Sequence, residues 1–156
     1  MKFCCLLIDV KDTQKTRNFY ENVMRLKVSL DLAPNVAFGN GTTAFAIQEK
    51  FSELVNADDF NTTCKGNDHE LVFEEDNYDE FEEHIKQFED IIFVHKTKEY
   101  PWGQRVMRFY DPDFHVIEVG ESMESIFKKF FKQGMSIDEV AERTGHPVDF
   151  VSKYFS

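Results

Sequence analysis

The sequence has few of the features that would indicate a secreted or membrane-spanning protein. Only 3 of its 156 residues are cysteine, and Cys4 and Cys5 are adjacent. Neighbouring residues of a strand point to opposite faces, so these two thiols cannot easily form a disulfide. No apolar run approaches the ~20 residues of a membrane-spanning helix, and Asp9 interrupts the apolar N-terminal stretch before it resembles a signal peptide. We therefore expect a cytoplasmic protein with reduced thiols and no membrane partner.

Positive charge is also scarce, with 18 Lys and Arg against 29 Asp and Glu, which gives a net charge of -11. Residues 122–156 hold five basic and five acidic side chains, so residues 1–121 carry the whole deficit. Binding to nucleic acid depends on Lys and Arg at phosphates, and the charge therefore argues against a nucleic-acid partner. An apolar fraction of 42% fits a globular chain with one main buried core.

The chain contains an internal repeat, in which residues 5–48 and 70–118 each read as one strand, one helix and three strands. Aligning the first strands places Cys5 on Glu70, and aligning the closing strands places Gln48 on Glu118. Two half-barrels related by this repeat would place the four side chains around one cavity. The sequence therefore predicts an α+β fold of two βαβββ modules with a site formed by Cys5, Gln48, Glu70 and Glu118.

Local patterns place the elements of both modules. Asp12 or Thr13 caps a helix over residues 14–24 whose inward stripe includes Phe19 and Tyr20, and the first strand is expected to bury both faces. Asn40-Gly41 is typical of a type I′ hairpin turn. The further elements expected are strands over residues 26–32, 36–38, 42–48, 70–74, 91–96, 104–110 and 115–119, and a helix over residues 78–88. We predict a domain over residues 1–121, with modules at 1–50 and 69–121 and a linker at 51–68.

Residues 122–156 form a helical appendage in this prediction. Helices are expected over residues 122–132, 137–144 and 148–155, and Gly134 and Gly145 end the first two. Their short turns resemble a helix-turn-helix unit. The last helix has no basic face, whereas its aromatic residues favour packing or a homodimer contact over DNA binding.

Two segments resemble the vicinal oxygen chelate superfamily, which includes glyoxalases, bleomycin-resistance proteins and extradiol dioxygenases. They are Val10-Lys-Asp-Thr-Gln-Lys-Thr-Arg-Asn-Phe-Tyr20 and Tyr100-Pro-Trp-Gly-Gln-Arg-Val-Met-Arg-Phe-Tyr-Asp-Pro-Asp-Phe-His-Val-Ile-Glu-Val119. The resemblance implies a glyoxalase-like cupped barrel, closed within one chain or between two chains of a dimer. It also implies one divalent metal ion at the positions of Cys5, Gln48, Glu70 and Glu118.

The chain departs from the family pattern at the predicted metal site. No histidine stands at the four positions, and a set of two carboxylates, one amide and one thiol suits zinc poorly. Mn²⁺, Fe²⁺, Ni²⁺ and Mg²⁺ stay open alongside zinc, as does a site without metal. Phe114 replaces the glycine that is usual after Asp-Pro-Asp, where a positive φ would strain a bulky residue.

Each candidate residue has a functional and a structural interpretation. Glu118 and Glu70 are candidate ligands or general bases, and the alternative for Glu118 is a salt bridge to Arg105 or Arg108. Cys5 is also compatible with an inert buried thiol. Trp102 and Arg105 are candidates for holding a substrate, as an aromatic wall and an anion clamp, and their alternative is packing and surface pairing.

Two functions follow from these residues. The first is a metal-dependent lyase, isomerase or dioxygenase in which Glu118 and Glu70 are catalytic. The second is a metal-free protein that binds an aromatic or cationic small molecule, as in the bleomycin-resistance branch of the family, and the missing histidines and the net charge favour it. A ligand-sensing DNA-binding regulator is a third alternative.

Overall fold

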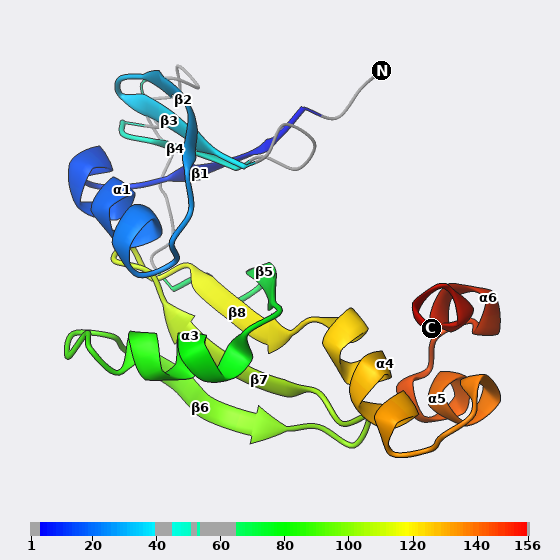
Figure 1. The fold of residues 1–156 in the computed structure, drawn as a ribbon. Helices are drawn as coiled ribbons and strands as arrows, with labels where there is room; N and C mark the ends of the chain where they lie inside the picture. Colours follow the sequence, from blue (N-terminus) through cyan, green and yellow to red (C-terminus); the bar gives the residue numbers. More distant parts are fainter. Residues whose placement is uncertain (1–3, 40–44, 51–52, 54–64, 156) are drawn as a thin grey trace. The chain divides into compact units, whose positions relative to one another are not determined.

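The computed structural model describes residues 4–39, 45–50, 53 and 65–155, and these form two compact units (Figure 1). One unit comprises residues 1–69 together with 110–115, and the other comprises residues 70–109 together with 116–156. Each unit contains one four-stranded mixed sheet and one helix against it. The α+β fold of two βαβββ modules is therefore confirmed.

The sheet of the first unit has the strand order β1-β4-β3-β2. Its strands are Leu6–Asp9 (β1), Val28–Leu32 (β2), Asn35–Phe38 (β3) and Phe45–Gln48 (β4). β1 runs parallel to β4, and the other two pairs are antiparallel. The predicted turn at Asn40-Gly41 and most of the linker lie outside the described residues.

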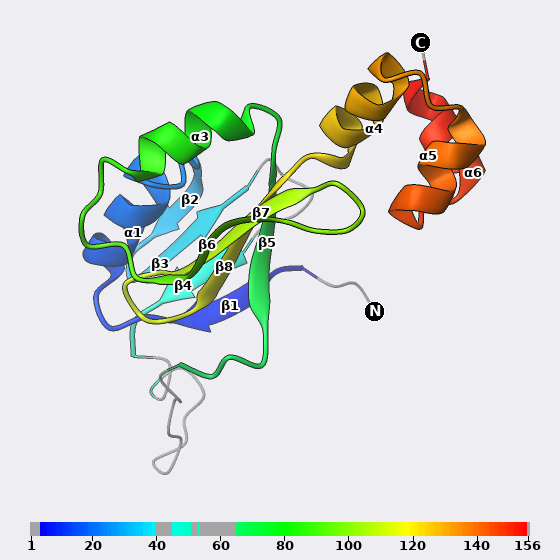
Figure 2. The same cartoon turned by 90° about the horizontal axis from the view of Figure 1, so that it is seen from below.

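The helix of this unit, α1 at Thr13–Asn22, begins where the sequence predicts. The side chain of Asp12 accepts a hydrogen bond from the backbone N–H of Lys15, which satisfies one free donor of the first turn. Phe19 and Tyr20 are buried, and the Tyr20 ring packs against Phe38 of the sheet at a centroid distance of 5.2 Å. The apolar stripe of α1 therefore covers one face of the sheet (Figure 2).

The turn at residues 110–115 belongs to the first unit although it lies in the second repeat. Asp111 has a fully buried side chain that accepts hydrogen bonds from the Tyr20 hydroxyl at 2.9 Å and from Nδ1 of His115 at 2.8 Å. Asp113 accepts a further bond from the Thr16 hydroxyl at 2.7 Å. The turn is thereby fixed to α1, and Phe114 within it has a positive φ, at +69°, although it is not a glycine.

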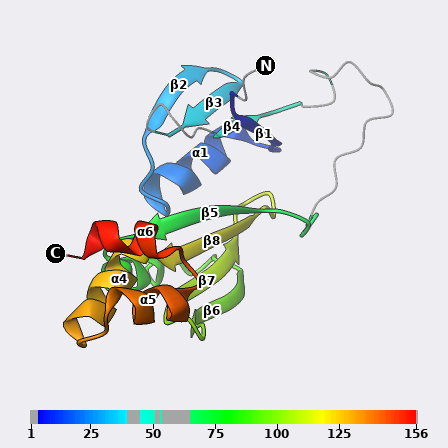
Figure 3. The ribbon, with the colours of Figure 1, turned by 90° about the vertical axis from the view of Figure 1, so that its right-hand side faces the viewer.

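The second unit has the strand order β5-β8-β7-β6. Its strands are Glu70–Glu75 (β5), Phe93–Glu99 (β6), Arg105–Tyr110 (β7) and Val116–Glu121 (β8), and its helix α3 spans Tyr78–Ile85. The inner residues Tyr78, Phe81 and Ile85 recur at helical spacing and are buried. Figure 3 shows the four strands side by side in the order β5, β8, β7 and β6. On the face opposite Leu71, Val72 of β5 is 60% exposed.

The C-terminal helices are present as predicted. They are α4 at Met123–Lys132, α5 at Ile137–Thr144 and α6 at Val148–Val151, followed by a 3₁₀ turn η1 at Ser152–Tyr154. Their own core contains Phe127, Phe130 and Val140. Ser136 and Glu139 form a capping box at the start of α5, and Gly145 ends it at a φ of +70°.

One expectation about the first strand is wrong. Ile8 is buried, but Leu6 is 41% exposed and Leu7 and Asp9 are only partly covered, so β1 does not bury both faces. Cys5 precedes the strand and is exposed, which also contradicts the buried-thiol interpretation. The apolar residues at the N-terminus led to the prediction that both faces of β1 are buried, whereas α1 covers only one face of the sheet.

Candidate functional site

The face of the second sheet that α3 does not cover carries both predicted carboxylates of the second module. β5 and β8 pair in parallel, with Glu70 opposite Val116 and Val72 opposite Glu118. Alternation along each strand sends Leu71 and Ile117 into the core and turns Glu70 and Glu118 to the other side. The repeat therefore predicts correctly that these two side chains share one face.

Arg108 of β7 joins the two carboxylates on this face. Its Nε donates to Glu70 at 2.8 Å, its Nη2 donates to the other oxygen of Glu70 at 3.4 Å, and Nη2 also donates to Glu118. The side chains are 23% exposed for Arg108, 34% for Glu70 and 13% for Glu118. Two carboxylates therefore share one guanidinium at intermediate burial, where ion pairs are stronger than at the open surface.

The remaining donors of Arg108 are used as well. Nη1 donates to the hydroxyl of Tyr100 at 2.8 Å and contacts Nε2 of His95 at 3.1 Å. Nδ1 of His95 lies 2.9 Å from the carbonyl oxygen of Lys96, so the ring carries its proton on Nδ1 and accepts from Arg108 through Nε2. All five N–H groups of the guanidinium thus have acceptors, and we call these five residues, Glu70, His95, Tyr100, Arg108 and Glu118, the Arg108 cluster.

The charge of the cluster follows from these contacts. Burial lowers the pKa of Arg108, but its hydrogen bonds to Glu70 and Tyr100 raise the pKa by more, so the net shift is upward and the guanidinium keeps its charge. With His95 neutral, two ionised carboxylates and one guanidinium leave one net negative charge. A ligand that binds to this face would therefore contact a surface of net negative charge in which the Arg108 guanidinium is held between two carboxylates.

An aromatic pair lies beside the cluster. The rings of Tyr100 and Trp102 stack with centroids 4.6 Å apart and planes 21° apart. The Trp102 indole N–H donates to the side-chain oxygen of Gln104 at 3.0 Å, and the Gln104 amide donates to the Glu121 carbonyl at 2.8 Å. Trp102 is therefore stacked on Tyr100, and its role as an aromatic wall for a substrate stays a prediction.

Arg105 lies on the other face of the same sheet. It is three residues from Arg108 along β7, and strand alternation therefore turns it toward α3, where its guanidinium is 5.0 Å from the Tyr78 ring centroid. It donates to Glu121 at 2.7 Å and to Asp79 at 2.6 Å. These contacts are the surface pairing that the sequence left as the alternative to an anion clamp, and the structure does not bring Arg105 to the Arg108 cluster.

The two candidates of the first module lie in the first unit. Gln48 is 9% exposed at the end of β4, where its amide donates to the Glu49 carbonyl at 2.7 Å and its oxygen accepts from Asn35 at 3.2 Å. Both ends of this amide are therefore engaged in hydrogen bonds within the first unit. Cys5 is exposed and lies before β1.

The residues of the Arg108 cluster do not fit a divalent metal ion as they stand. The carboxylates that would be ligands are bound to a guanidinium, and a divalent ion roughly 4 Å from that charge would be repelled by about 8 kcal/mol at an effective dielectric constant of about 20. Within the described residues, no three His, Cys, Asp or Glu side chains are placed so that they could hold a metal. Glu70 and Glu118, the two carboxylates that the family resemblance implies as metal ligands, are thus already paired with the cation of Arg108.

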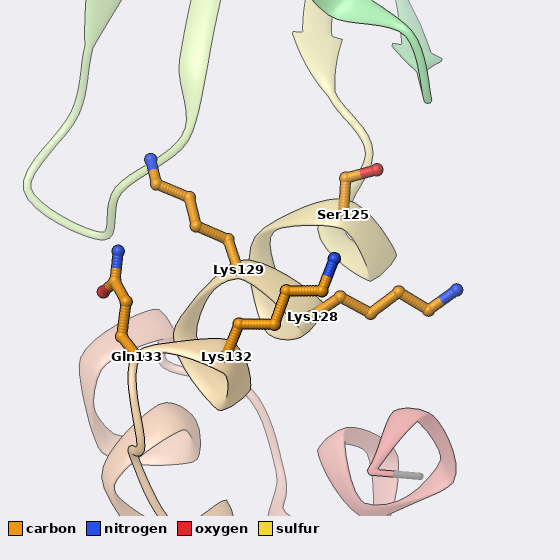
Figure 4. A pocket seen from close by; sticks show the side chains of 5 residues that line it. All are labelled: Ser125, Lys128, Lys129, Lys132 and Gln133. Atoms are coloured by element: carbon orange, nitrogen blue, oxygen red, sulfur yellow. The ribbon is translucent and has the colours of Figure 1, made fainter.

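A further groove lies on α4, outside the Arg108 cluster. It has a volume of about 550 Å³ and is lined by Ser125, Lys128, Lys129, Lys132 and Gln133 (Figure 4). Lys128 pairs with Glu124 one turn earlier at 2.5 Å. The groove is wide and solvated, and its lining residues lie on the C-terminal appendage and include none of the residues that the sequence selected.

Comparison with known proteins identifies the family. Residues 3–124 match the glyoxalase-like domain family, which is most of the chain, so the protein belongs to this family, within the vicinal oxygen chelate superfamily. Among curated proteins, none matches the chain. No helix among the described residues is long and apolar enough to cross a membrane.

Solved structures agree with this assignment. A protein of unknown function from Agrobacterium tumefaciens str. C58 is 33% identical, with a TM-score of 0.66 over 78% of this chain and 94% of that one. A lactoylglutathione lyase from Agrobacterium tumefaciens is 22% identical, with a TM-score of 0.61 over 78% and 94%. The fosfomycin resistance protein FosX from Mesorhizobium loti is 15% identical, with a TM-score of 0.57 over 78% and 92%. The last two show the shared fold.

Sequence reasoning missed three members of the Arg108 cluster as parts of a site. Arg108 was considered only as a salt-bridge partner, and His95 and Tyr100 were not singled out. The alternation of β7 could have identified Arg108, because Arg105 and Arg108 must face opposite ways and only one of them can meet Glu118. The contact to His95 depends on the register shifts of β6 against β7, which no sequence pattern shows.

Proposed function

We propose that the protein binds a small organic molecule over the Arg108 cluster and that this binding needs no divalent metal. The observation that supports it best is the engagement of both Glu70 and Glu118 by Arg108. In a metal-dependent lyase or dioxygenase these oxygens would have to be available to the ion. Family membership supports a small-molecule site, whereas the donor set favours the metal-free alternative.

The ligand that suits this face is flat, aromatic and cationic. The cluster has one net negative charge, which attracts a cation, and the Tyr100–Trp102 stack offers an aromatic surface next to it. Arg108 has already used its five donors, so an anionic ligand would have to displace a carboxylate of the protein itself. The protein is thus a metal-independent binding or sequestering protein for aromatic cations, and it acts as a homodimer.

Metal content provides the first test. The purified protein is expected to contain no stoichiometric Mn, Fe, Ni or Zn and to show no rise in melting temperature with any of these ions or Mg²⁺. A metal bound at one equivalent, removed by a chelator with loss of thermal stability, would contradict the proposal and favour the enzymatic alternative. Light scattering at micromolar concentration tests the homodimer.

Binding provides the second test. The chain has a single tryptophan, so its fluorescence reports on Trp102 alone. We expect N-methylquinolinium to bind and to quench this fluorescence, in the presence of chelator, at least five-fold more tightly than quinoline, which has the same rings and is neutral at pH 8. Glu118→Gln should abolish the preference for the cation, because it removes the net negative charge. Equal affinities for the two probes in the wild type would contradict the proposed ligand class.

A further inference from the structure

The stacked pair of the proposed site is carried by the loop between β6 and β7. This loop turns tightly, with the Tyr100 N–H bonded to the Gln104 carbonyl at 2.9 Å and the Gly103 N–H bonded to the Tyr100 carbonyl at 2.8 Å. Gly103 has a φ of +88°, a conformation that favours glycine. The position of Trp102 therefore depends on what holds Gly103 and its neighbours.

Helix α4 of the C-terminal appendage packs directly against this glycine. A Cβ atom built on Gly103 would lie 2.4 Å from Cζ of Phe130, so the phenyl ring occupies the space that any other side chain would need. Phe130 itself is 2% exposed and belongs to the core of the appendage, and the Arg143 guanidinium from α5 lies 4.5 Å from its ring centroid. The loop thus rests against a side chain that contacts from two helices hold in place, and Figure 1 shows α4 beside the loop between β6 and β7.

The other end of α4 is fixed to the same sheet. The Ser122 N–H donates to the Glu75 carbonyl at the end of β5, at 3.1 Å. The Ser122 side chain caps the helix by accepting from the Ser125 N–H, and the Ser125 hydroxyl donates to the Asp76 carbonyl at 3.4 Å. These contacts fix the start of α4, and Phe130, two turns further on, is directed at the loop.

We propose that the C-terminal appendage acts as a brace for the Tyr100–Trp102 pair, with Phe130 as the positioning residue. The match to the glyoxalase-like family ends at residue 124, so the helices that form the brace lie beyond the family domain. Through Gly103 the appendage sets where the stacked pair stands beside Arg108, which is the face assigned above to the ligand. This role in ligand binding rests on the proposed function, whereas the mechanical contact does not.

Phe130→Ala tests the brace through the spectrum of Trp102. With the ring removed, the loop loses its support, and we expect a red shift of several nanometres in Trp102 emission and a weaker near-ultraviolet circular dichroism signal from the stack. The spectra are compared below the unfolding transition, with far-ultraviolet circular dichroism confirming that the helices remain. Phe155→Ala is the matched control, because Phe155 lies in the same appendage but is 53% exposed, and its spectra should equal the wild type.

Phe130→Leu takes the place of Phe130→Ala in this test if the alanine variant fails to fold, because leucine retains most of the apolar volume of the side chain. It should give a smaller shift in the same direction. A folded Phe130→Ala or Phe130→Leu protein with the wild-type Trp102 spectrum would overturn the proposal, because a purely stabilising role would leave the folded-state signal unchanged.

Titration with N-methylquinolinium separates this inference from the proposed function. If both hold, Phe130→Ala weakens binding of the probe at least five-fold and Phe155→Ala leaves it unchanged. If the wild type does not bind the probe while Phe130→Ala still shifts the Trp102 spectrum, the brace holds and the proposed function fails. Unchanged probe affinity in Phe130→Ala would overturn the role of the brace in binding.

Discussion

Replacing Arg108 with methionine should expose how much the cluster depends on its one cation. The substitution keeps the apolar stem and leaves Glu70 and Glu118 on the same sheet face without a counter-charge. Removing one partner of a fully buried ion pair costs roughly 3–5 kcal/mol, whereas exposed pairs contribute about 0–1 kcal/mol. With exposed fractions of 34% for Glu70 and 13% for Glu118, this cluster lies between the two cases. We expect a loss of about 2–3 kcal/mol at pH 8.

Urea unfolding followed by circular dichroism measures this loss, and the melting temperature should fall by roughly 4–12 °C for a chain of this size. The triple variant Arg108→Met, Glu70→Gln, Glu118→Gln is the control, since removing all three charges should recover most of the stability.

Two results would refute the reasoning about the cluster. A single Arg108→Met variant as stable as the wild type at pH 8 would mean that the carboxylates are solvated rather than held by the guanidinium. A triple variant no more stable than Arg108→Met would mean that packing of the arginine stem, and not charge, accounts for the effect.

Three further predictions concern the first unit and the appendage. Burial lowers the pKa of His115, but the hydrogen bond and charge of Asp111 outweigh it and raise the pKa overall. Stability from this pair is therefore full below about pH 6.5 and is lost as pH rises through the raised pKa. The difference in stability between the wild type and His115→Gln, measured by urea unfolding, should shrink from about pH 6 to pH 8, and a constant difference would contradict this. Tyr20→Phe removes a buried hydrogen bond to Asp111 and should cost about 1–3 kcal/mol in the same assay, a cost below 0.5 kcal/mol counting against the bond. Ser136→Ala removes the capping box with Glu139 and should cost about 1 kcal/mol, checked by thermal unfolding against Ser152→Ala.

The sequence predicted the elements well where a local signal and a tertiary role coincide. Asp12 is a local capping signal, and it directly precedes the apolar stripe of α1 that packs on the sheet. The predicted start of the helix, at residue 14, is therefore within one residue of the observed start at Thr13. The burial of the first strand was predicted less well, because its apolar residues do not indicate which face of the strand a helix covers. Leu6 is apolar and 41% exposed for that reason.

The candidate site was predicted in part for a similar reason. Strand alternation and the repeat were enough to put Glu70 and Glu118 on one face, because both depend only on spacing. Their partner depends on which residue of β7 faces them, and the sequence left Arg105 and Arg108 as equals. The neutral form of His95 needs three-dimensional contacts on both ring nitrogens, which spacing does not provide.

The turn at residues 110–115 has a consequence for how the two repeats can be separated. A polypeptide that stopped at residue 69 would contain every strand and helix of the first unit but would lack Asp111, the acceptor for the buried Tyr20 hydroxyl. During synthesis, therefore, the first repeat cannot complete its interior until most of the second has left the ribosome. Although the chain repeats one order of strands and helix, the first repeat on its own therefore lacks an acceptor that its interior uses.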